Sequence, residues 1–175
     1  MKIRSVFFLF ILLCCLPASV FAQEKTSKEQ KEQQKLEQQK QTEALVNSKT
    51  FVFVGGTAYP QGGRAINLTT RANWVKFDPE RIDCDMPYFG RIYSGGGYGG
   101  NEGGLKFTGE PSEFTITKAK KKFFVTTAVK SGVDSYKLTL DVGFQGNATL
   151  TVISGSRSTI SYQGIIAAPQ PAESK

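Results

Sequence analysis

The chain has 175 residues, a formal net charge of +7 and no histidine. Its length suits a single domain of ordinary size. The lack of histidine excludes Ser-His-Asp and Cys-His catalysis, histidine-based metal sites and the usual proton carrier at neutral pH. The positive charge aids solubility, but it is not gathered into the basic face that a nucleic-acid-binding protein needs.

Residues 1–22 have the pattern of a cleavable signal peptide. Lys2 and Arg4 precede an apolar run over residues 6–16, and Ala22 offers the small residue of a cleavage site. The run has eleven residues, whereas a membrane-spanning helix needs about 20. We therefore expect export, cleavage after Ala22 and a mature chain without a transmembrane span, with a net charge lowered to +5.

Lipidation is the alternative to simple cleavage. Cys14 and Cys15 lie late in the apolar run, where a lipoprotein carries its acylated cysteine, but Leu13 or Cys14 stands where a lipobox needs a small residue. We favour simple cleavage and keep peripheral or lipid-anchored membrane association as the second interpretation. Cys84 is then the one cysteine of the mature chain, so no intramolecular disulfide can form and the fold depends on its core.

Residues 23–49 form a separate polar segment, rich in Glu, Lys and Gln. These residues favour helix. The segment has almost no apolar residues before Leu45, so a helix here would have no apolar stripe to bury. The composition predicts a solvated helical linker that serves as a tether.

Residues 50–168 predict one antiparallel β domain. β-Branched and aromatic residues alternate with Gly, Pro and Asn turns, and no segment has a helical period that could supply the crossovers of a parallel sheet. The predicted strands are residues 51–54, 65–70, 74–77, 81–86, 89–93, 105–108, 113–118, 122–129, 136–142, 148–153 and 159–163. About 8–10 strands indicate a β-sandwich or an up-and-down barrel, and residues 169–175 predict a disordered tail.

Strict alternation of apolar and polar residues identifies the face of each strand that is buried. It is clearest at Tyr136, Leu138, Leu140 and Val142. The same rhythm places Cys84 on a buried face, where we expect an inert thiol.

The most unusual segment combines aromatic residues with seven glycines between Gly95 and Gly104. Aromatic rings and an Arg/Glu pair on such backbone suit contact with a sugar or a peptide. The candidate binding residues are Tyr88, Arg91, Tyr93, Tyr98 and Glu102, with Arg64 in the turn at residues 60–64 as a further candidate. The alternative interpretation is a mobile connection whose glycines permit positive φ.

Two charged clusters carry weaker alternatives. Asp83 and Asp85 share one strand face and are the best carboxylate pair for acid–base chemistry, but two solvated charges are the simpler explanation, and we expect no enzyme. Lysines at residues 118 and 120–122 fall at a predicted hairpin turn, where charge keeps strand ends soluble. Contact with anionic lipid headgroups is the alternative for these lysines.

Several blocks of the chain resemble an uncharacterised bacterial family, domain of unknown function 4251. They are Phe51-Val52-Phe53-Val54, Gly62-Gly63-Arg64-x-Ile66-Asn67-Leu68, Pro87-Tyr88-Phe89-Gly90-Arg91-x-Tyr93-Ser94, Glu102-Gly103-Gly104 and Ile160-Ser161-Tyr162-Gln163-Gly164-Ile165. The resemblance implies an exported envelope protein of Bacteroidetes-type bacteria without an assigned activity. It supplies no site residue that could be transferred to this chain.

Together these patterns predict an exported, non-catalytic β domain of the cell envelope, periplasmic or outer-membrane-associated, or else secreted. The first hypothesis is a binding module for an envelope protein or glycan at the Tyr/Gly-rich loop. The second is a purely structural or interaction component without a small ligand. We expect no cofactor, no metal and no nucleic-acid partner.

Overall fold

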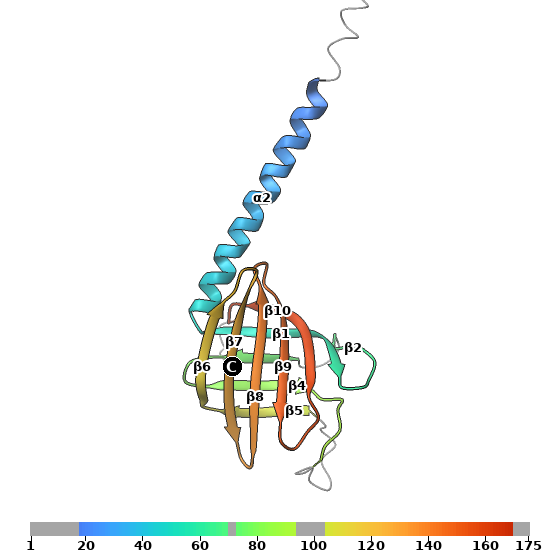
Figure 1. Ribbon diagram of the computed structural model, residues 1–175, viewed down its shortest axis with the longest axis vertical. Coiled ribbons are helices and arrows are strands. Elements are labelled where there is room, and N and C mark those ends of the chain that lie inside the picture. Colours follow the sequence, from blue (N-terminus) through green and yellow to red (C-terminus); the bar gives the residue numbers. More distant parts are fainter. Residues whose placement is uncertain (1–17, 70–72, 94–103, 170–175) are drawn as a thin grey trace, which may run out of the picture. The chain divides into compact units, whose positions relative to one another are not determined.

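The computed structural model describes residues 18–69, 73–93 and 104–169, with side chains from residue 28 onward (Figure 1). It contains one described helix, α2 (Ala18–Asn47), followed by strands. The strands are β1 (Phe51–Pro60), β2 (Ile66–Asn67), β3 (Trp74–Phe77), β4 (Ile82–Pro87), β5 (Gly104–Gly109), β6 (Pro111–Lys118), β7 (Lys122–Ser131), β8 (Asp134–Gly143), β9 (Asn147–Ser154) and β10 (Ile160–Ala167). The chain divides into two compact units, Met1–Glu37 and Gln38–Lys175.

The end of α2 belongs to the second unit and packs on its core. Described side chains before Gln38 are exposed, whereas Thr42 and Val46, one turn apart, are buried and Leu45 is half-buried. The helix ends where Lys49 adopts a positive φ of 59°, and the Ser48 hydroxyl donates to the Leu45 carbonyl at 2.7 Å. Only the last turns of this polar helix therefore have apolar surface to bury.

The strands form one antiparallel sheet in the order β5-β4-β3-β1-β10-β9-β8-β7-β6, with β2 paired to β1. The run from Gly104 to Lys118 is interrupted only at Glu110: its first half pairs with β4 and its second half pairs with β7. Strand β5 also contacts β7. The sheet therefore bends back on itself and nearly closes into a barrel, which decides between the sandwich and the barrel that the sequence left open.

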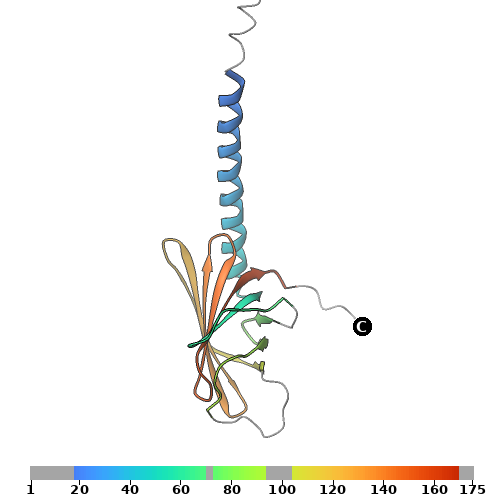
Figure 2. The same ribbon diagram turned by 90° about the vertical axis from the view of Figure 1, so that its right-hand side faces the viewer.

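Two layers of this sheet face each other. In Figure 1, β7, β8 and β9 lie in front of β1, β4 and β5 and run across them. Figure 2 shows the same layers from the side, with β1 (teal) and the green strands opposite the orange hairpins. Such crossed layers bury the alternate side chains of both.

The core is built from these alternate positions, as predicted. Tyr136, Leu138, Leu140 and Val142 on β8 are all buried. Cys84 is buried on β4 with 5% of its surface exposed, and its thiol donates to the Leu105 carbonyl at 3.3 Å. The predicted antiparallel β fold and the buried face of Cys84 are thus confirmed.

Two predicted strands differ from the structure. Of the predicted strand at residues 65–70, the described residues 65–69 supply only the short β2, and residues 89–93 form no strand but a single bridge between Ile92 and Arg157. The hydroxyl of Tyr88 lies 2.9 Å from the Arg91 carbonyl. An extended chain would separate these residues by about 10 Å, so the segment must turn between them. The β propensity of Phe89, Ile92 and Tyr93 does not anticipate this turn.

Candidate functional site

The two ends of β4 carry the two candidate sites. We call residues 88–93 together with residues 156–158 the tyrosine end, because β4 leads into Tyr88 through Pro87. We call Asp78, Glu80, Arg81 and Asp83 the aspartate end, because they lie where β3 ends and β4 begins. Tyr98 and Glu102, which the sequence also proposed as binding residues, lie outside the described residues.

Tyr88 is a buried residue of the tyrosine end, not a displayed one. Its surface is 8% exposed, and the Arg157 guanidinium lies over its ring at 5.2 Å from the centroid. Its hydroxyl lies 2.8 Å from the Ser158 carbonyl and 2.9 Å from both the Ser158 Oγ and the Arg91 carbonyl. This tyrosine therefore fixes the surrounding backbone and offers no open ring face for a ligand.

Backbone hydrogen bonds extend this anchoring along the segment. The Ser158 amide donates to the Arg91 carbonyl at 2.8 Å, and the Tyr93 amide donates to the Ser156 carbonyl at 2.7 Å. The Arg91 amide in turn donates to the Ser158 Oγ at 2.9 Å. Residues 91–93 are thus bound to the connection between β9 and β10. The bridge between Ile92 and Arg157 joins residues that are 65 positions apart in the chain.

Three large apolar side chains are exposed on this fixed segment. Tyr93 is 65% exposed, Ile92 44% and Phe89 38%, and Arg91 beside them is exposed. Arg64 is also exposed, in the turn after β1. That turn and the tyrosine end are at the same end of the sheet, because Pro60, the last residue of β1, pairs with Ile160. The structure thus places Arg64, Arg91 and Tyr93 at this end, on its surface.

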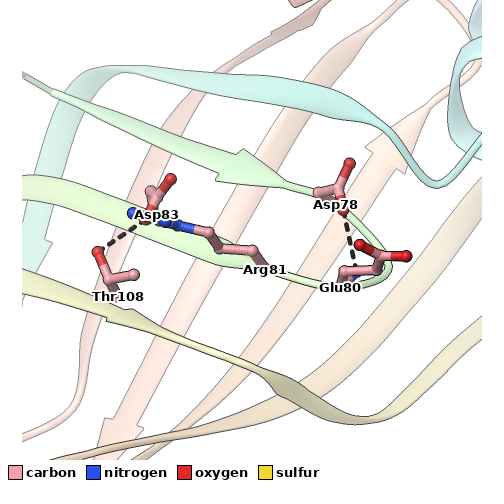
Figure 3. Close-up of polar contacts among 5 residues, drawn as sticks. All are labelled: Asp78, Glu80, Arg81, Asp83 and Thr108. Carbon is pink, nitrogen blue, oxygen red and sulfur yellow. Dashed lines mark hydrogen bonds and ion pairs between the residues drawn. The ribbon is translucent and has the colours of Figure 1, made fainter.

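The predicted carboxylate pair shares one outer face of β4, but each carboxylate has a cation beside it. Asp83 Oδ1 accepts hydrogen bonds from Arg81 Nε at 2.9 Å and from Thr108 Oγ1 at 2.7 Å (Figure 3). Lys106 Nζ lies 4.0 Å from Asp85 Oδ1. Both carboxylates are half-buried on the sheet.

Ionisation of Asp83 is favoured by its neighbours. Burial opposes the charge, yet the hydrogen bonds from Thr108 and Arg81, with the charges of Arg81 and Lys76, outweigh it and lower the pKa of Asp83 below the usual 3.8. By contrast, burial raises the pKa of the Cys84 thiol, with the Asp85 charge as the second cause. Asp83 is therefore a carboxylate at neutral pH and Cys84 is an unreactive thiol.

An open cavity of about 390 Å³ lies at the aspartate end. Its walls come from four places in the sequence: the start of β1, the end of β3, the loop into β4 with Asp83, and Pro169 after β10. Sequence reasoning missed this cavity, because no local pattern indicates that the start of β1 and residue 169 meet the loop at Glu80. The one local feature is the turn in which Asp78 Oδ1 accepts from the Glu80 amide at 2.9 Å.

The lysine-rich hairpin is present as predicted. The Ala119 amide donates to the Lys122 carbonyl at 2.8 Å, so β6 and β7 are joined by a tight turn. Lys118 pairs with Glu43 and Lys122 pairs with Asp141. Two of the four lysines therefore have carboxylate partners within the fold.

Within residues 18–69, 73–93 and 104–169, no three His, Cys, Asp or Glu side chains are arranged to hold a metal ion. The described helix is not long and apolar enough to cross a membrane.

The fold and these two ends define a small antiparallel β domain, a nearly closed sheet with a polar N-terminal helix. Residues 31–166 match the family described as "Domain of unknown function (DUF4251)". The chain belongs to this family, as the resemblance in its sequence blocks predicted.

A solved structure shares the fold. The crystal structure of a DUF4251 family protein from Bacteroides eggerthii superposes with a TM-score of 0.58 and 17% sequence identity, over 75% of this chain and 87% of that chain. No curated protein matches the chain.

Proposed function

We propose that this chain is an exported, non-catalytic domain of the cell envelope that binds another envelope protein through residues 89–93. The observation that carries this proposal is the exposure of Phe89, Ile92 and Tyr93 on a backbone that buried hydrogen bonds hold in place. A segment ordered before binding loses little conformational entropy on binding. Aromatic and arginine side chains are also enriched where proteins contact each other.

A protein partner suits these side chains better than a glycan. Ile92 and Phe89 offer exposed apolar surface without hydrogen-bonding groups, and large exposed apolar side chains close together in the chain favour a protein–protein contact. Arg91 adds a cation at the same place, so the complementary surface is apolar with a carboxylate nearby.

Export is the part of the proposal that rests on residues 1–22. It is tested by purifying the chain from the native host and determining its N-terminus by mass spectrometry. We expect material that begins at Gln23. An acylated cysteine at the N-terminus would replace simple cleavage with lipid anchoring, and an intact N-terminus in the cytoplasm would contradict export.

Binding is tested by photocrosslinking in the native host. A benzoylphenylalanine in place of Tyr93 should give a discrete adduct of protein mass, which Ile92→Asp should abolish. The same probe in place of Val133, which is 99% exposed but lies outside the tyrosine end, is the matched control and should give no such adduct. Equal adducts at both positions, or none at Tyr93, would overturn the proposal. A carbohydrate adduct at Tyr93 would favour the glycan instead.

A further inference from the structure

The cavity at the aspartate end is bordered by charges of opposite sign. In Figure 3 the carboxyl groups of Asp78 and Glu80 lie together at the loop, whereas the Arg81 side chain extends away from them along the start of β4 to Asp83. All four residues line the cavity. A ligand in the cavity would therefore meet negative charge on one side and a guanidinium on the other.

Asp83 positions the guanidinium of Arg81, and the two terminal nitrogens of the group remain available to a ligand. Its Nε donates to Asp83 Oδ1, an oxygen that also accepts from Thr108, which holds the group close to Asp83. No described residue forms a hydrogen bond with its two terminal nitrogens, and the side chain is 64% exposed. Two such N–H groups side by side match the two oxygens of a carboxylate.

On the negative side, Asp78 already accepts hydrogen bonds within the protein, whereas the Glu80 carboxylate remains available to a ligand. Asp78 accepts from the Glu80 amide through Oδ1 at 2.9 Å and from the Thr50 hydroxyl through Oδ2 at 3.5 Å. The Glu80 carboxylate is exposed and has no partner among the described residues. Glu80 is therefore the acceptor that a ligand ammonium group would meet.

The remaining wall adds a second cation and apolar surface. Lys76 on β3 pairs in register with Asp83, so its charge is on the Arg81 side, and its Nζ lies 4.7 Å from the centroid of the Trp74 ring. Phe51, Val52 and Phe77 also line the cavity, but Phe51 and Phe77 are buried, so the accessible apolar surface comes from Val52. The volume of about 390 Å³ is near the lower limit of small-molecule sites, which span roughly 300–1,000 Å³.

From this arrangement we infer that the cavity binds a small zwitterion of amino-acid or dipeptide size with an apolar side chain. The ligand carboxylate binds Arg81, its ammonium group binds Glu80, and its apolar side chain packs against Val52. Asp83 is a positioning residue for Arg81. A ligand with only one charge would be attracted to one side of the cavity and repelled by the other.

The experiment uses the mature chain labelled with ¹⁵N and the dipeptide L-alanyl-L-phenylalanine. Titration should shift the NMR signals of the backbone amides of Val52, Lys76 and Asp83. The shifts should saturate with a dissociation constant below about 10 mM, the range of weak small-ligand affinity. Arg81→Gln and Glu80→Gln should each weaken binding about tenfold, the usual loss for a charge-assisted hydrogen bond. N-acetylated and C-amidated forms of the dipeptide should lose affinity to a similar extent.

Matched controls separate the site from general charge. Lys130→Gln and Glu110→Gln remove one cation and one anion that do not line the cavity and should leave the affinity unchanged. The inference is overturned if the three amides do not shift, if the blocked dipeptides bind as well as the zwitterion, or if the control variants weaken binding as much as Arg81→Gln. Melting curves of each variant confirm that it is folded.

This site is independent of the proposed partner surface. The dipeptide titration reports on the aspartate end, whereas the crosslinking reports on the tyrosine end. Either result can fail without changing the other.

Discussion

The two ends of β4 differ in where their polar groups form hydrogen bonds. At the tyrosine end, the hydroxyl of Tyr88 forms its hydrogen bonds inside the protein, with Ser158 and Arg91, and three large apolar side chains are exposed on the surface beside Arg91. At the aspartate end, Arg81 and Glu80 keep hydrogen-bonding groups directed to solvent beside an open cavity. Buried hydrogen bonds stabilise a backbone, whereas half-exposed charges remain available for a ligand.

This difference has an energetic consequence. When a buried hydroxyl is removed, water cannot reach its hydrogen-bond partner to replace it, so the free energy of unfolding falls substantially. A half-exposed ion pair is screened by solvent and contributes little to stability. Substitutions should therefore affect stability mainly at the tyrosine end and ligand binding mainly at the aspartate end.

The largest effect should come from a substitution that disrupts the pairing of β1 with β10, on which both ends depend. A Cβ on Gly164 would collide with the backbone of Val54 on β1, whereas a Cβ on Gly155 meets no atom within 4 Å. Gly164→Ala should lower the free energy of unfolding by about 3 kcal/mol or more, and Gly155→Ala should leave it within about 0.5 kcal/mol. Urea unfolding followed by circular dichroism measures both. Equal stability of the two variants would show that the β1–β10 register is wrong.

The next effect tests the tyrosine end itself. Tyr88→Phe removes the hydroxyl and with it the hydrogen bond to the buried Ser158 carbonyl, which should lower the free energy of unfolding by about 1–3 kcal/mol. Tyr93→Phe removes an exposed hydroxyl and is the matched control. Thermal unfolding of the two variants compares them directly, and the anchoring role of Tyr88 fails if they melt together.

At the aspartate end the expected change is smaller and depends on pH. The folded-state pKa of Asp83 is lower than the usual 3.8, so the carboxylate stabilises the fold above the unfolded-state pKa and that stabilisation is lost as the pH falls through the lower folded-state value. Asp83→Asn should lower stability by about 1 kcal/mol at neutral pH. Its stability should also fall less steeply than that of the wild type below about pH 4. Urea midpoints measured from pH 7 to pH 2 give both curves, and parallel curves would refute the ionised role of Asp83.

The smallest effect concerns the end of α2. Lys118 forms an ion pair with Glu43 and is half-exposed, so Lys118→Gln should lower stability by about 0.2–1 kcal/mol. Lys120→Gln, in the same hairpin, has no such pair among the described residues and should be neutral. A difference in urea midpoint that disappears in 1 M salt would identify the pair, because salt screens exposed charges.

The sequence predicted most of the regular structure because its strands have one buried face. Every second residue is apolar from Tyr136 to Val142 on β8 and from Ala148 to Val152 on β9, and these alternate residues are the buried ones. The prediction failed at residues 89–93 for a physical reason. Apolar content indicated a strand there, but Tyr88 reaches Ser158, 70 residues away along the chain, and that contact shapes the segment.

The candidate sites show the same limit. Arg64, Arg91 and Tyr93 were proposed from their residue types, and the structure places them on the surface of one end of the sheet. Tyr88 was proposed with them, yet its ring is buried beneath Arg157. Residue type alone does not distinguish a tyrosine that displays its ring from one that anchors the backbone with its hydroxyl.

By itself the sequence determined the class of the domain, its antiparallel strands, the buried face of Cys84 and the membership of its family. These follow from local alternation and from motifs, which neighbouring residues specify. The tertiary structure alone decided that the sheet nearly closes, that Glu110 marks the bend between β5 and β6, and that Arg81 and Glu80 border a cavity with Pro169. Such features depend on pairing between distant segments, and no local pattern of side chains encodes which segments will meet.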